Sequence, residues 1–515
     1  MPTRTTERGS QARPARSALL IGAAALAALA ATTGARNPAS APVAAAGQPN
    51  ILLILADDLD RAEIAQMPIL RQQVITKGLT FSNAFVSTPI CCPSRATILR
   101  GQYAHNTGIK RNTVPEGGFP TAYASGLEHS TVATWLDDAG YATALIGKYL
   151  NGYPRTATQT YVPPGWDEWY SAVMGDPYSE YDYTLNENGT LVSYGHAPAD
   201  YGTTVYTGKA QDVMTRAARA GQPFFVWLSV YAPHAPSTPA PEDVNLFPGA
   251  IAPRTPNYNE ADVSDKPLWL QALPLMKAPK QAEVDAIYRE RIRSLQAVDR
   301  AVAALIGTLA GNGQLANTYV VFTSDNGFHL GPHRMPHGKD TAYDEDIHVP
   351  LHVRGPGVPA NRKRPHLVGN IDLAPTFAAL AGAAAPAFVD GRSLAPLLTG
   401  TPPGTAAWRH NYLLGHWVPT PGAAPAAGHD EPPDRDDLDF EVLAVTKPEL
   451  HGVRTPRYTY VELATGEKEL YDHAVDPYEL NNIATSAPAA LLRRLHQKLV
   501  GLQACSGADC RVADR

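Results

Sequence analysis

Three things are scarce in this 515-residue chain: cysteine, surplus positive charge and long apolar runs. The formal net charge is −6 and the lysines and arginines are scattered, which argues against nucleic acid or an anionic membrane surface as the main partner. Apart from one run near the N-terminus, no apolar run is long enough to cross a bilayer, so we expect no stable membrane insertion. The four cysteines can pair in three ways.

The N-terminus has the pattern of a targeting segment. Arg13 and Arg16 precede an uncharged run, rich in alanine and leucine, over residues 17–31. A charged region before a short apolar one is typical of a secretory signal peptide, and the run is short for the alternative, a transmembrane anchor. We therefore predict a signal peptide over residues 1–35, a flexible leader over residues 36–48, and a secreted, extracellular protein of bacterial origin.

Apolar runs alternate with helical stripes through most of the chain. Continuous apolar runs are typical of strands buried on both faces of a parallel sheet, and apolar steps of three or four are typical of helices. Strands are predicted at Ile51–Ala56, Tyr141–Ile146, Phe224–Tyr231 and Tyr319–Thr323, and helices at Thr131–Gly140, before Gly221 and over Ala282–Leu309. This alternation predicts an α/β fold with a mainly parallel sheet sandwiched by helices.

Small residues and prolines accumulate between Gly382 and Pro403, where we expect a domain boundary. Residues 49–395 are predicted to form the catalytic domain, and residues 396–515 a smaller C-terminal α+β domain built on an antiparallel sheet. Its predicted strands are Tyr412–Leu414, Glu441–Val445, Arg457–Val461 and Lys468–Tyr471, and a closing helix is predicted near Ala489–Leu502.

The run Cys91-Cys92-Pro93-Ser94-Arg95 places a thiol four residues before an arginine. Positive charge favours the thiolate, so Cys91 is a candidate reactive group; the alternative is a structural disulfide or a small buried side chain. A bond between adjacent cysteines is strained, so we expect none there and expect Cys92 to be a buried thiol. Cys505 and Cys510 close a short loop, where export would permit a disulfide.

Oxygen-bearing side chains follow two of the predicted strands. Asp57 and Asp58 come directly after the first strand, and Asp325 and Asn326 come shortly after the strand at Tyr319. Ligands of open α/β sheets bind where loops leave the carboxyl ends of strands. Three carboxylates and an amide oxygen suit calcium or magnesium, and the alternative is a set of helix caps or turn residues.

The motif Cys-x-Pro-Ser-Arg resembles the signature of the type I sulfatases, and the run Ser87–Gly101 around it resembles the N-acetylglucosamine-6-sulfatase and arylsulfatase branch. The segment Glu469–Asn482 is also similar to theirs, although Arg100 stands where many members have threonine. The resemblance implies an alkaline-phosphatase-like fold and a sulfuric ester hydrolase. It also implies that a formylglycine-generating enzyme oxidises Cys91 to formylglycine during maturation.

The same resemblance implies a role for each candidate residue. A hydroxyl of the formylglycine hydrate attacks sulfur, and the second hydroxyl later expels inorganic sulfate. The implied metal is Ca²⁺, with Mg²⁺ as the alternative, and its ligands are Asp57, Asp58, the modified Cys91, Asp325 and Asn326. The other implied catalytic residues are Arg95, which holds the hydrate, Lys148 and Lys339, which hold the sulfate, and His234, the general acid. The alternatives are surface charges for the lysines and a structural role for His234.

One position departs from the pattern of many sulfatases. Leu150 stands where they have a histidine that helps to break down the sulfated hydrate, as it also does in the glucosamine-6-sulfatase-like branch. The nearby histidines could replace it or contact substrate, and the sequence does not choose among them: His105, His329, His333 and His337.

The predicted substrate is a sulfated carbohydrate such as 6-O-sulfated glucosamine, or an aryl sulfate. Two alternatives stay open: a phosphate or phosphonate monoester hydrolase of the same superfamily, and a non-catalytic glycan-binding relative in which Cys91 is never converted. The segments expected to set specificity are residues 236–280 and the acidic residues 429–439, whose charge favours a small or lightly sulfated substrate.

Overall fold

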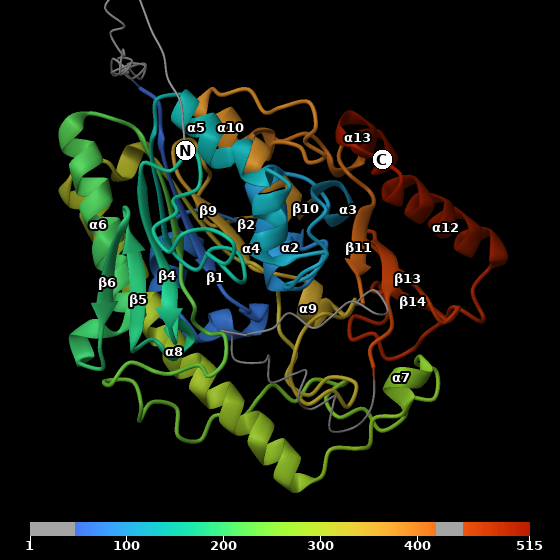
Figure 1. Cartoon of the computed structure of the whole chain (residues 1–515). Helices are drawn as coiled ribbons and strands as arrows, with labels where there is room; N and C mark the ends of the chain where they lie inside the picture. The colour runs from blue at the N-terminus through green and yellow to red at the C-terminus, as the bar shows by residue number, and fades with distance from the viewer. Residues whose placement is uncertain (1–46, 419–445) are drawn as a thin grey trace, which may run out of the picture. The chain divides into compact units, whose positions relative to one another are not determined.

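The computed structural model describes residues 47–418 and 446–515, and its largest feature is a ten-stranded sheet in the order β10-β2-β9-β8-β1-β7-β3-β4-β5-β6 (Figure 1). The strands are β1 Asn50–Ala56, β2 Leu79–Phe85, β3 Ala142–Gly147, β4 Glu168–Gly175, β5 Tyr183–Glu187, β6 Thr190–Tyr194, β7 Phe224–Ser229, β8 Thr318–Ser324, β9 Leu351–Arg354 and β10 Arg362–Gly369. The central strands β8, β1, β7, β3 and β4 run parallel, whereas β9, β5 and β6 pair antiparallel with their neighbours.

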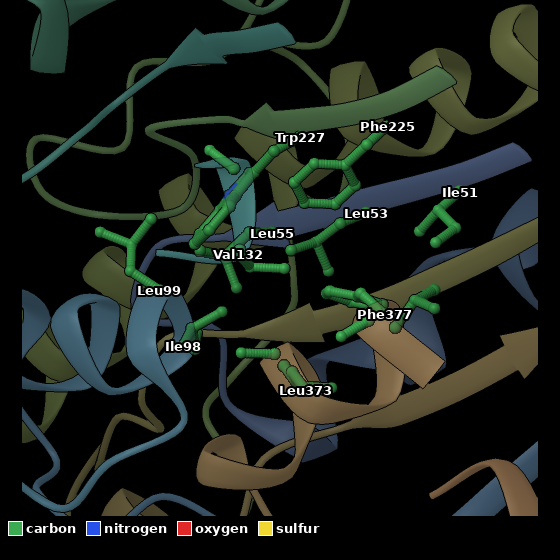
Figure 2. Packing of buried hydrophobic residues seen from close by; sticks show 14 of the residues in the cluster. Ile51, Leu53, Leu55, Ile98, Leu99, Val132, Phe225, Trp227, Leu373 and Phe377 are labelled. Atoms are coloured by element: carbon green, nitrogen blue, oxygen red, sulfur yellow. The ribbon is translucent and has the colours of Figure 1, made fainter. Parts of the chain in front are cut away.

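Helices cover both faces of this sheet, as the sequence predicted. The helices are α1 Pro68–Leu70, α2 Cys91–Arg100, α3 Ala104–Thr107, α4 Gly118–Ala124, α5 Val132–Asp138, α6 Gly202–Ala220, α7 Leu268–Gln271, α8 Ala278–Gly311, α9 Asp344–Ile347, α10 Leu373–Ala381, α12 Ala489–Gln503 and α13 Cys510–Ala513. Alternate side chains of β1 point to opposite faces: Ile51, Leu53 and Leu55 pack with α2, α5 and α10 (Figure 2), whereas Leu52 and Ile54 pack with α6 and α8.

The predicted strands and helices of the catalytic region are confirmed as β1, β3, β7 and β8 and as α5, α6 and α8. The α8 helix begins four residues before the predicted start, and Pro279 stands in its first turn, where proline is well tolerated. Six further strands of the large sheet were not predicted. They include β6 and the first half of β10, which are largely exposed and therefore lack a continuous apolar run.

A second, antiparallel sheet follows along the chain, with strands β11 Tyr412–His416, β12 Leu450–Arg454, β13 Tyr458–Leu463 and β14 Lys468–Asp472. The helix α12 confirms the predicted closing helix. The predicted strand at residues 441–445, the acidic residues 429–439 and the predicted signal peptide lie outside the described residues. The described residues, 47–418 and 446–515, belong to one compact unit, and the domain boundary at residue 395 stays a prediction.

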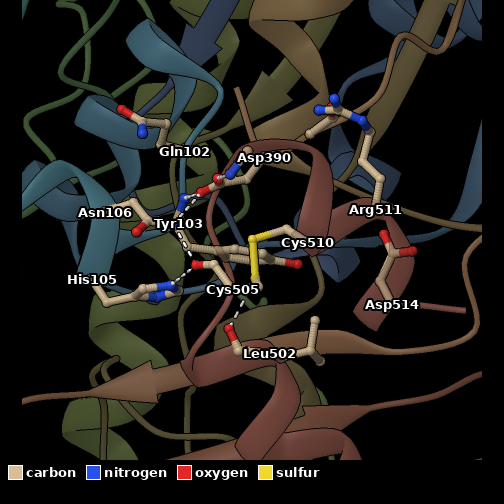
Figure 3. The surroundings of a disulfide bond; sticks show 12 residues. Gln102, Tyr103, His105, Asn106, Asp390, Leu502, Cys505, Cys510, Arg511 and Asp514 are labelled. Carbon is tan, nitrogen blue, oxygen red and sulfur yellow. Dashed lines mark hydrogen bonds between the residues drawn. A yellow bond between two sulfur atoms is a disulfide. The ribbon is translucent and has the colours of Figure 1, made fainter. Parts of the chain in front are cut away.

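The predicted disulfide joins Cys505 to Cys510 near the C-terminus (Figure 3). The carbonyl oxygen of Cys505 accepts hydrogen bonds from His105 Nε2 and Asn106 Nδ2, both at 3.0 Å. Asp390 accepts from the backbone N–H of Gly507 as well as from Asn106. The C-terminal segment is therefore fastened to α3, which directly follows α2.

Residues 236–280 form a mostly irregular segment that contains the short helix α7 and ends in the first turn of α8. Asn257 Nδ2 donates to Glu345 Oε1 at 2.9 Å, and Lys266 Nζ donates to the carbonyl oxygen of Leu480 at 2.7 Å. The segment therefore connects α9 to the chain after β14. No helix among the described residues is long and apolar enough to span a bilayer.

Candidate active site

Three carboxylates leave the large sheet at neighbouring strand ends. The β1 and β8 strands pair in parallel with Ala56 opposite Ser324, so Asp57 and Asp325 emerge side by side. The backbone of Asp58 turns at a φ of 63°, and its N–H donates to Asp325 Oδ1 at 3.1 Å. Aspartate adopts that left-handed conformation more readily than most residues. All three carboxylates are buried.

Cys91 reaches these carboxylates as the first residue of α2. Its Sγ lies 3.5 Å from Asp57 Oδ1 and 3.8 Å from Asp58 Oδ1. Cys92 points elsewhere, because consecutive helical residues are rotated by about 100°, and it packs in the apolar cluster of α2, α5 and α10. Neither cysteine is in a disulfide; Cys92 is buried, as predicted, and Cys91 is buried as well.

Two cations contact the carboxylates: Arg95, from α2, and Lys148, from the end of β3. Arg95 lies one helical turn after Cys91, and its Nε donates to Asp325 Oδ2 at 2.8 Å while one terminal nitrogen lies 3.6 Å from Asp57. Lys148 follows β3 directly, and its Nζ donates to Asp57 Oδ2 at 2.6 Å. Both side chains are buried, so the alternative of a solvated surface charge does not hold for Lys148.

Two further ionisable side chains, Lys339 and His234, lie beside the carboxylates. Lys339 Nζ donates to both oxygens of Asp58, at 2.8 and 2.9 Å, and lies 3.2 Å from Cys91 Sγ. His234 Nδ1 pairs with the carbonyl oxygen of Ala235 at 2.8 Å, and its Nε2 lies 3.6 Å from Asp58 Oδ2. Since a carbonyl can only accept, Nδ1 carries a proton and Nε2 is the atom presented to the site.

The side chains present fit a hard divalent cation. Asp57, Asp58, Cys91 and His234 each offer a ligand atom, and these atoms lie within 4.8 Å of one another. Asn326 Nδ2 donates to Asp58 Oδ1 at 2.7 Å. Its buried Oδ1 has no hydrogen-bond partner within residues 47–418 and 446–515. An unpartnered buried amide oxygen beside carboxylates is a donor set that calcium and magnesium favour.

The charges shift the acidities of the site in opposite directions. Burial alone would raise the pKa of Asp57, but Lys148, His234 and Arg95 outweigh it and hold that pKa well below its usual value. Burial raises the pKa of Asp325 to about 6 despite its pairing with Arg95. Burial also raises the pKa of Cys91 well above its usual value, so the unmodified thiol stays protonated.

Two contributors were missed at the level of sequence. Ser229 Oγ accepts from Arg95 at 2.7 Å, and as the last residue of β7 it carries the same signal as Asp57, a polar side chain at a strand end. Tyr178 lies with its ring centroid 5.0 Å from Lys148 Nζ and 4.6 Å from the His234 ring. Nothing in the sequence distinguishes it from the other tyrosines.

The structure separates the four unassigned histidines. Three are held by partners outside the carboxylate cluster: His105 by Cys505, His329 by Asp346 and His333 by Glu260. His337 lines a cavity of about 160 Å³ together with Asp58. Leu150 is buried in the apolar core. Among the described residues, His337 is therefore the one of the four that shares a cavity with a candidate metal ligand.

A larger cleft, of about 470 Å³, begins at Lys148. Its walls combine aromatic and polar side chains, among them Tyr149, Asn151, Tyr153, Tyr178 and Tyr231. A cleft of this size accommodates a small ligand, and tyrosines with amides offer both stacking faces and hydrogen bonds.

Comparison with known proteins identifies the fold and the family. The sulfatase family model matches residues 49–383, more than half of the chain. The chain belongs to the sulfatase family. It is 36% identical to the N-acetylglucosamine-6-sulfatase of Capra hircus over 90% of this chain and 85% of the relative, and 35% identical to the arylsulfatase of Volvox carteri over 91% and 76%. This sulfatase is accordingly a sulfuric ester hydrolase.

Solved structures share its architecture. One, a complex with its substrate D-glucosamine-2-N,6-O-disulfate, matches with a TM-score of 0.71 at 24% identity over 91% of this chain and 99% of that chain. A phosphonate monoester hydrolase from Silicibacter pomeroyi matches with a TM-score of 0.65 at 26% identity over 88% and 94%. The alkaline-phosphatase-like fold, predicted from the sequence, is therefore confirmed.

Proposed function

We propose that this sulfatase is secreted and hydrolyses the sulfate ester of a sugar or an aryl alcohol, with formylglycine derived from Cys91 and a calcium ion. One observation carries the proposal: Cys91 Sγ is buried within 3.8 Å of two carboxylates and 3.2 Å from Lys339 Nζ. A cysteine kept only for packing has no need of charged neighbours, and Cys92 beside it has an apolar setting.

The unmodified side chains offer neither a hydroxyl nucleophile nor a Lewis acid, and the converted residue 91 and a metal ion would supply these two groups. Once a formylglycine-generating enzyme has converted Cys91, the hydrated aldehyde provides a hydroxyl nucleophile for sulfur. Calcium, or magnesium as the alternative, would supply a Lewis acid that lowers the pKa of a hydroxyl and offsets negative charge on the sulfuryl oxygens. The residues that would hold this ion are Asp57, Asp58, Asp325, Asn326 and the converted residue 91, and Asn326 Oδ1 is the oxygen left without a partner among the described residues.

The surrounding side chains can bind the sulfate, orient the carboxylates and donate a proton. Lys148 and Lys339 place two ammonium groups beside residue 91, where they can bind the sulfate and stabilise charge that develops on its oxygens. Arg95 orients Asp325 and Asp57. His234 presents Nε2, and in its protonated form this atom can give a proton to the leaving alcohol.

The cleft at Lys148 supports a sugar as the substrate. Its volume suits one or two sugar units, and its tyrosine and asparagine side chains suit pyranose rings and hydroxyls. The relative from Capra hircus is named for glucosamine 6-sulfate chemistry. We therefore propose a 6-O-sulfated glucosamine as the natural substrate class, with aryl sulfates as convenient substitutes.

Hydrolysis of phosphate or phosphonate monoesters is the second candidate, favoured by the similarity to a phosphonate monoester hydrolase. Matched sulfate, phosphate and phosphonate monoesters of one alcohol, assayed on one preparation, would rank them by kcat/KM. We expect the sulfate ester to rank first. A strong preference for phosphate or phosphonate would refute the proposal.

Mass spectrometry of the peptide across residues 91–95, from protein made in its native host, tests the conversion of Cys91. We expect the sulfur to be replaced by oxygen as an aldehyde or its hydrate. An intact thiol in every molecule, together with glycan binding without turnover, would identify a non-catalytic relative. Recovery of the protein inside cells with its first 35 residues intact would contradict secretion.

A further inference from the structure

The strand β11 of the antiparallel sheet lies against the segments that carry the active site. Residues two apart in a strand share a face, so Tyr412 and His416 point to the same side. The free edge of β11 is used as well: the backbone N–H of Gly415 donates to the carbonyl oxygen of Ser87 at 2.8 Å, four residues before Cys91. The strand β11 contributes no candidate catalytic residue, but it contacts the segment that leads into Cys91.

From Tyr412 a relay of buried hydrogen bonds runs to the backbone of a candidate metal ligand. Tyr412 Oη donates to Asn370 Oδ1 at 2.7 Å, and Asn370 Nδ2 donates to Ser94 Oγ at 2.9 Å. Ser94 Oγ in turn donates to the carbonyl oxygen of Asp325. The relay joins four distant positions of the chain, and its residues are no more than 5% exposed.

Packing holds the Tyr412 ring in place. A Cβ atom added at Gly369 would lie 2.2 Å from atoms of that ring, so only glycine allows the approach. With the ring fixed, its hydroxyl has a defined direction toward Asn370. A rigid donor at one end of a chain of hydrogen bonds orients every group after it.

The other end of β11 holds the segment of Lys339. His416 Nδ1 lies 2.8 Å from Asp340 Oδ1, and Lys447 Nζ donates to the carbonyl oxygen of Lys339 at 2.8 Å. Asp340 has a φ of 73°, a conformation that costs free energy and persists only where neighbours hold it. The residue His416 of β11 and Lys447, which precedes β12, therefore both contact the segment that carries Lys339.

We propose that β11 positions the active site, with Tyr412 acting on Asp325 through Asn370 and Ser94. The inference rests on the proposed function. It assigns these residues no contact with substrate; they hold the backbone of Asp325 so that its carboxylate keeps the orientation that the ion needs. Residues behind metal ligands commonly change affinity or activity by about 10–100-fold when removed.

Tyr412→Phe removes the first donor and keeps the ring. The matched control is Tyr460→Phe on β13, a buried tyrosine of the same sheet whose hydroxyl donates to Glu462 instead. We expect Tyr412→Phe to lower kcat about tenfold with KM nearly unchanged, and to weaken calcium binding to chelator-treated protein by a similar factor. Excess calcium should restore part of kcat. Tyr460→Phe should alter neither quantity, although it removes two hydrogen bonds, since Tyr460 Oη also accepts from Lys468 Nζ at 3.2 Å.

Ser94→Ala removes the last hydroxyl of the same relay, and it provides a second test of the relay if Tyr412→Phe does not fold. Activities are expressed per molecule with a converted residue 91, measured by mass spectrometry. Because the two residues act in series, the double variant should be no worse than the poorer single variant. Additive losses would overturn the relay, as would wild-type kcat and calcium affinity in Tyr412→Phe. A wild-type protein that cleaves no sulfate ester would instead refute the proposed function, and the calcium titration would still test the relay.

Discussion

The two sheets of this sulfatase differ in what they contribute to the candidate active site: the large sheet positions its side chains, and the antiparallel sheet supports them. The candidate catalytic side chains follow the parallel strands β1, β3, β7 and β8 or begin α2, whereas the antiparallel sheet of β11–β14 adds none within the described residues. Parallel strands bring all their carboxyl ends to one edge, so short loops there converge. Antiparallel strands alternate their ends, and this sheet instead offers its face and one edge to the catalytic loops.

The difference also appears in how each region is stabilised. At the edge of the large sheet, buried carboxylates and cations satisfy one another, which adds little net stability because burying each charge is costly. The antiparallel sheet has an apolar interior in which Leu470, Tyr460 and Leu414 are essentially unexposed. Substitutions in the first region should mainly affect activity, and those in the apolar interior of the second should mainly affect folding; Tyr412, whose hydroxyl begins the relay to Asp325, is the exception.

The sharpest contrast lies between two adjacent residues. Cys91→Ala removes the candidate nucleophile and should abolish sulfate release, a loss of several orders of magnitude. Cys92→Ala removes one buried sulfur from the apolar core and should keep most of the activity at a slightly lower melting temperature. Release of inorganic sulfate from an aryl sulfate measures both. Comparable activity in the Cys91 variant would remove the nucleophile assignment and the comparison with it.

The next largest effect is expected at a candidate metal ligand. Asp325→Asn keeps the shape of the side chain but removes a charge beside Arg95 and Asp57, so we expect kcat to fall at least about 100-fold and the calcium requirement to rise. Calcium titration of chelator-treated protein, with activity as the readout, measures this change.

A second buried aspartate provides the control for that experiment. Asp299 accepts hydrogen bonds from the backbone N–H groups of Ile69 and Leu70 at the start of α1, away from the cluster. Asp299→Asn should lower stability without changing the calcium requirement. An identical calcium dependence of the Asp325 and Asp299 variants would mean that Asp325 is not a ligand.

The sequence was sufficient for the parts of the site that depend on strand ends. Asp57, Asp58 and Lys148 directly follow continuous apolar runs, so their convergence follows from the topology of a parallel sheet. Family resemblance supplied the roles. The placement of Lys339, in a loop with several histidines, depended on that resemblance alone.

The support around the site could not be predicted, because it depends on tertiary register. The relay from Tyr412 to Asp325 passes through Asn370 and Ser94, and each step joins residues that are 42 or more positions apart. No local pattern distinguishes these polar residues from turn or cap residues. The strands β5 and β6 were missed for a related reason: β5 pairs antiparallel with β4 and β6 pairs antiparallel with β5, and neither strand contains a continuous apolar run.

A core substitution in each sheet tests the division directly. Leu470→Ala on β14 creates a cavity in the antiparallel sheet and should cost about 2–5 kcal/mol of stability. Leu53→Ala on β1 should cost a similar amount, but it also loosens the strand that presents Asp57. We therefore expect kcat per folded molecule to fall in the Leu53 variant and to stay near wild type in the Leu470 variant. Equal kcat values in the two would argue against separate roles.

The smallest effect on catalysis is expected at a buried carboxyl that belongs to neither region. Glu180 accepts hydrogen bonds from the backbone N–H and the hydroxyl of Thr203 near the start of α6, and burial raises its pKa to about 8 from a usual value of 4.5. The folded state therefore keeps a proton that the unfolded state loses. Above pH 4.5 folding stability falls with rising pH, at no more than about 1.4 kcal/mol per pH unit, until the group ionises near pH 8.

Glu180→Gln mimics the protonated form and should flatten that decline while leaving kcat unchanged. Denaturant unfolding at several values between pH 5 and 8 measures the slope. The control is Glu283→Gln on α8, where the ion pair with Lys280 is largely exposed and the slope should stay as in the wild type. A Glu180 variant with the wild-type slope would mean that the carboxyl ionises in the folded state. A change in kcat would instead mean that the part of the large sheet around Glu180 also supports the active site. Support of the site would then not be confined to the antiparallel sheet.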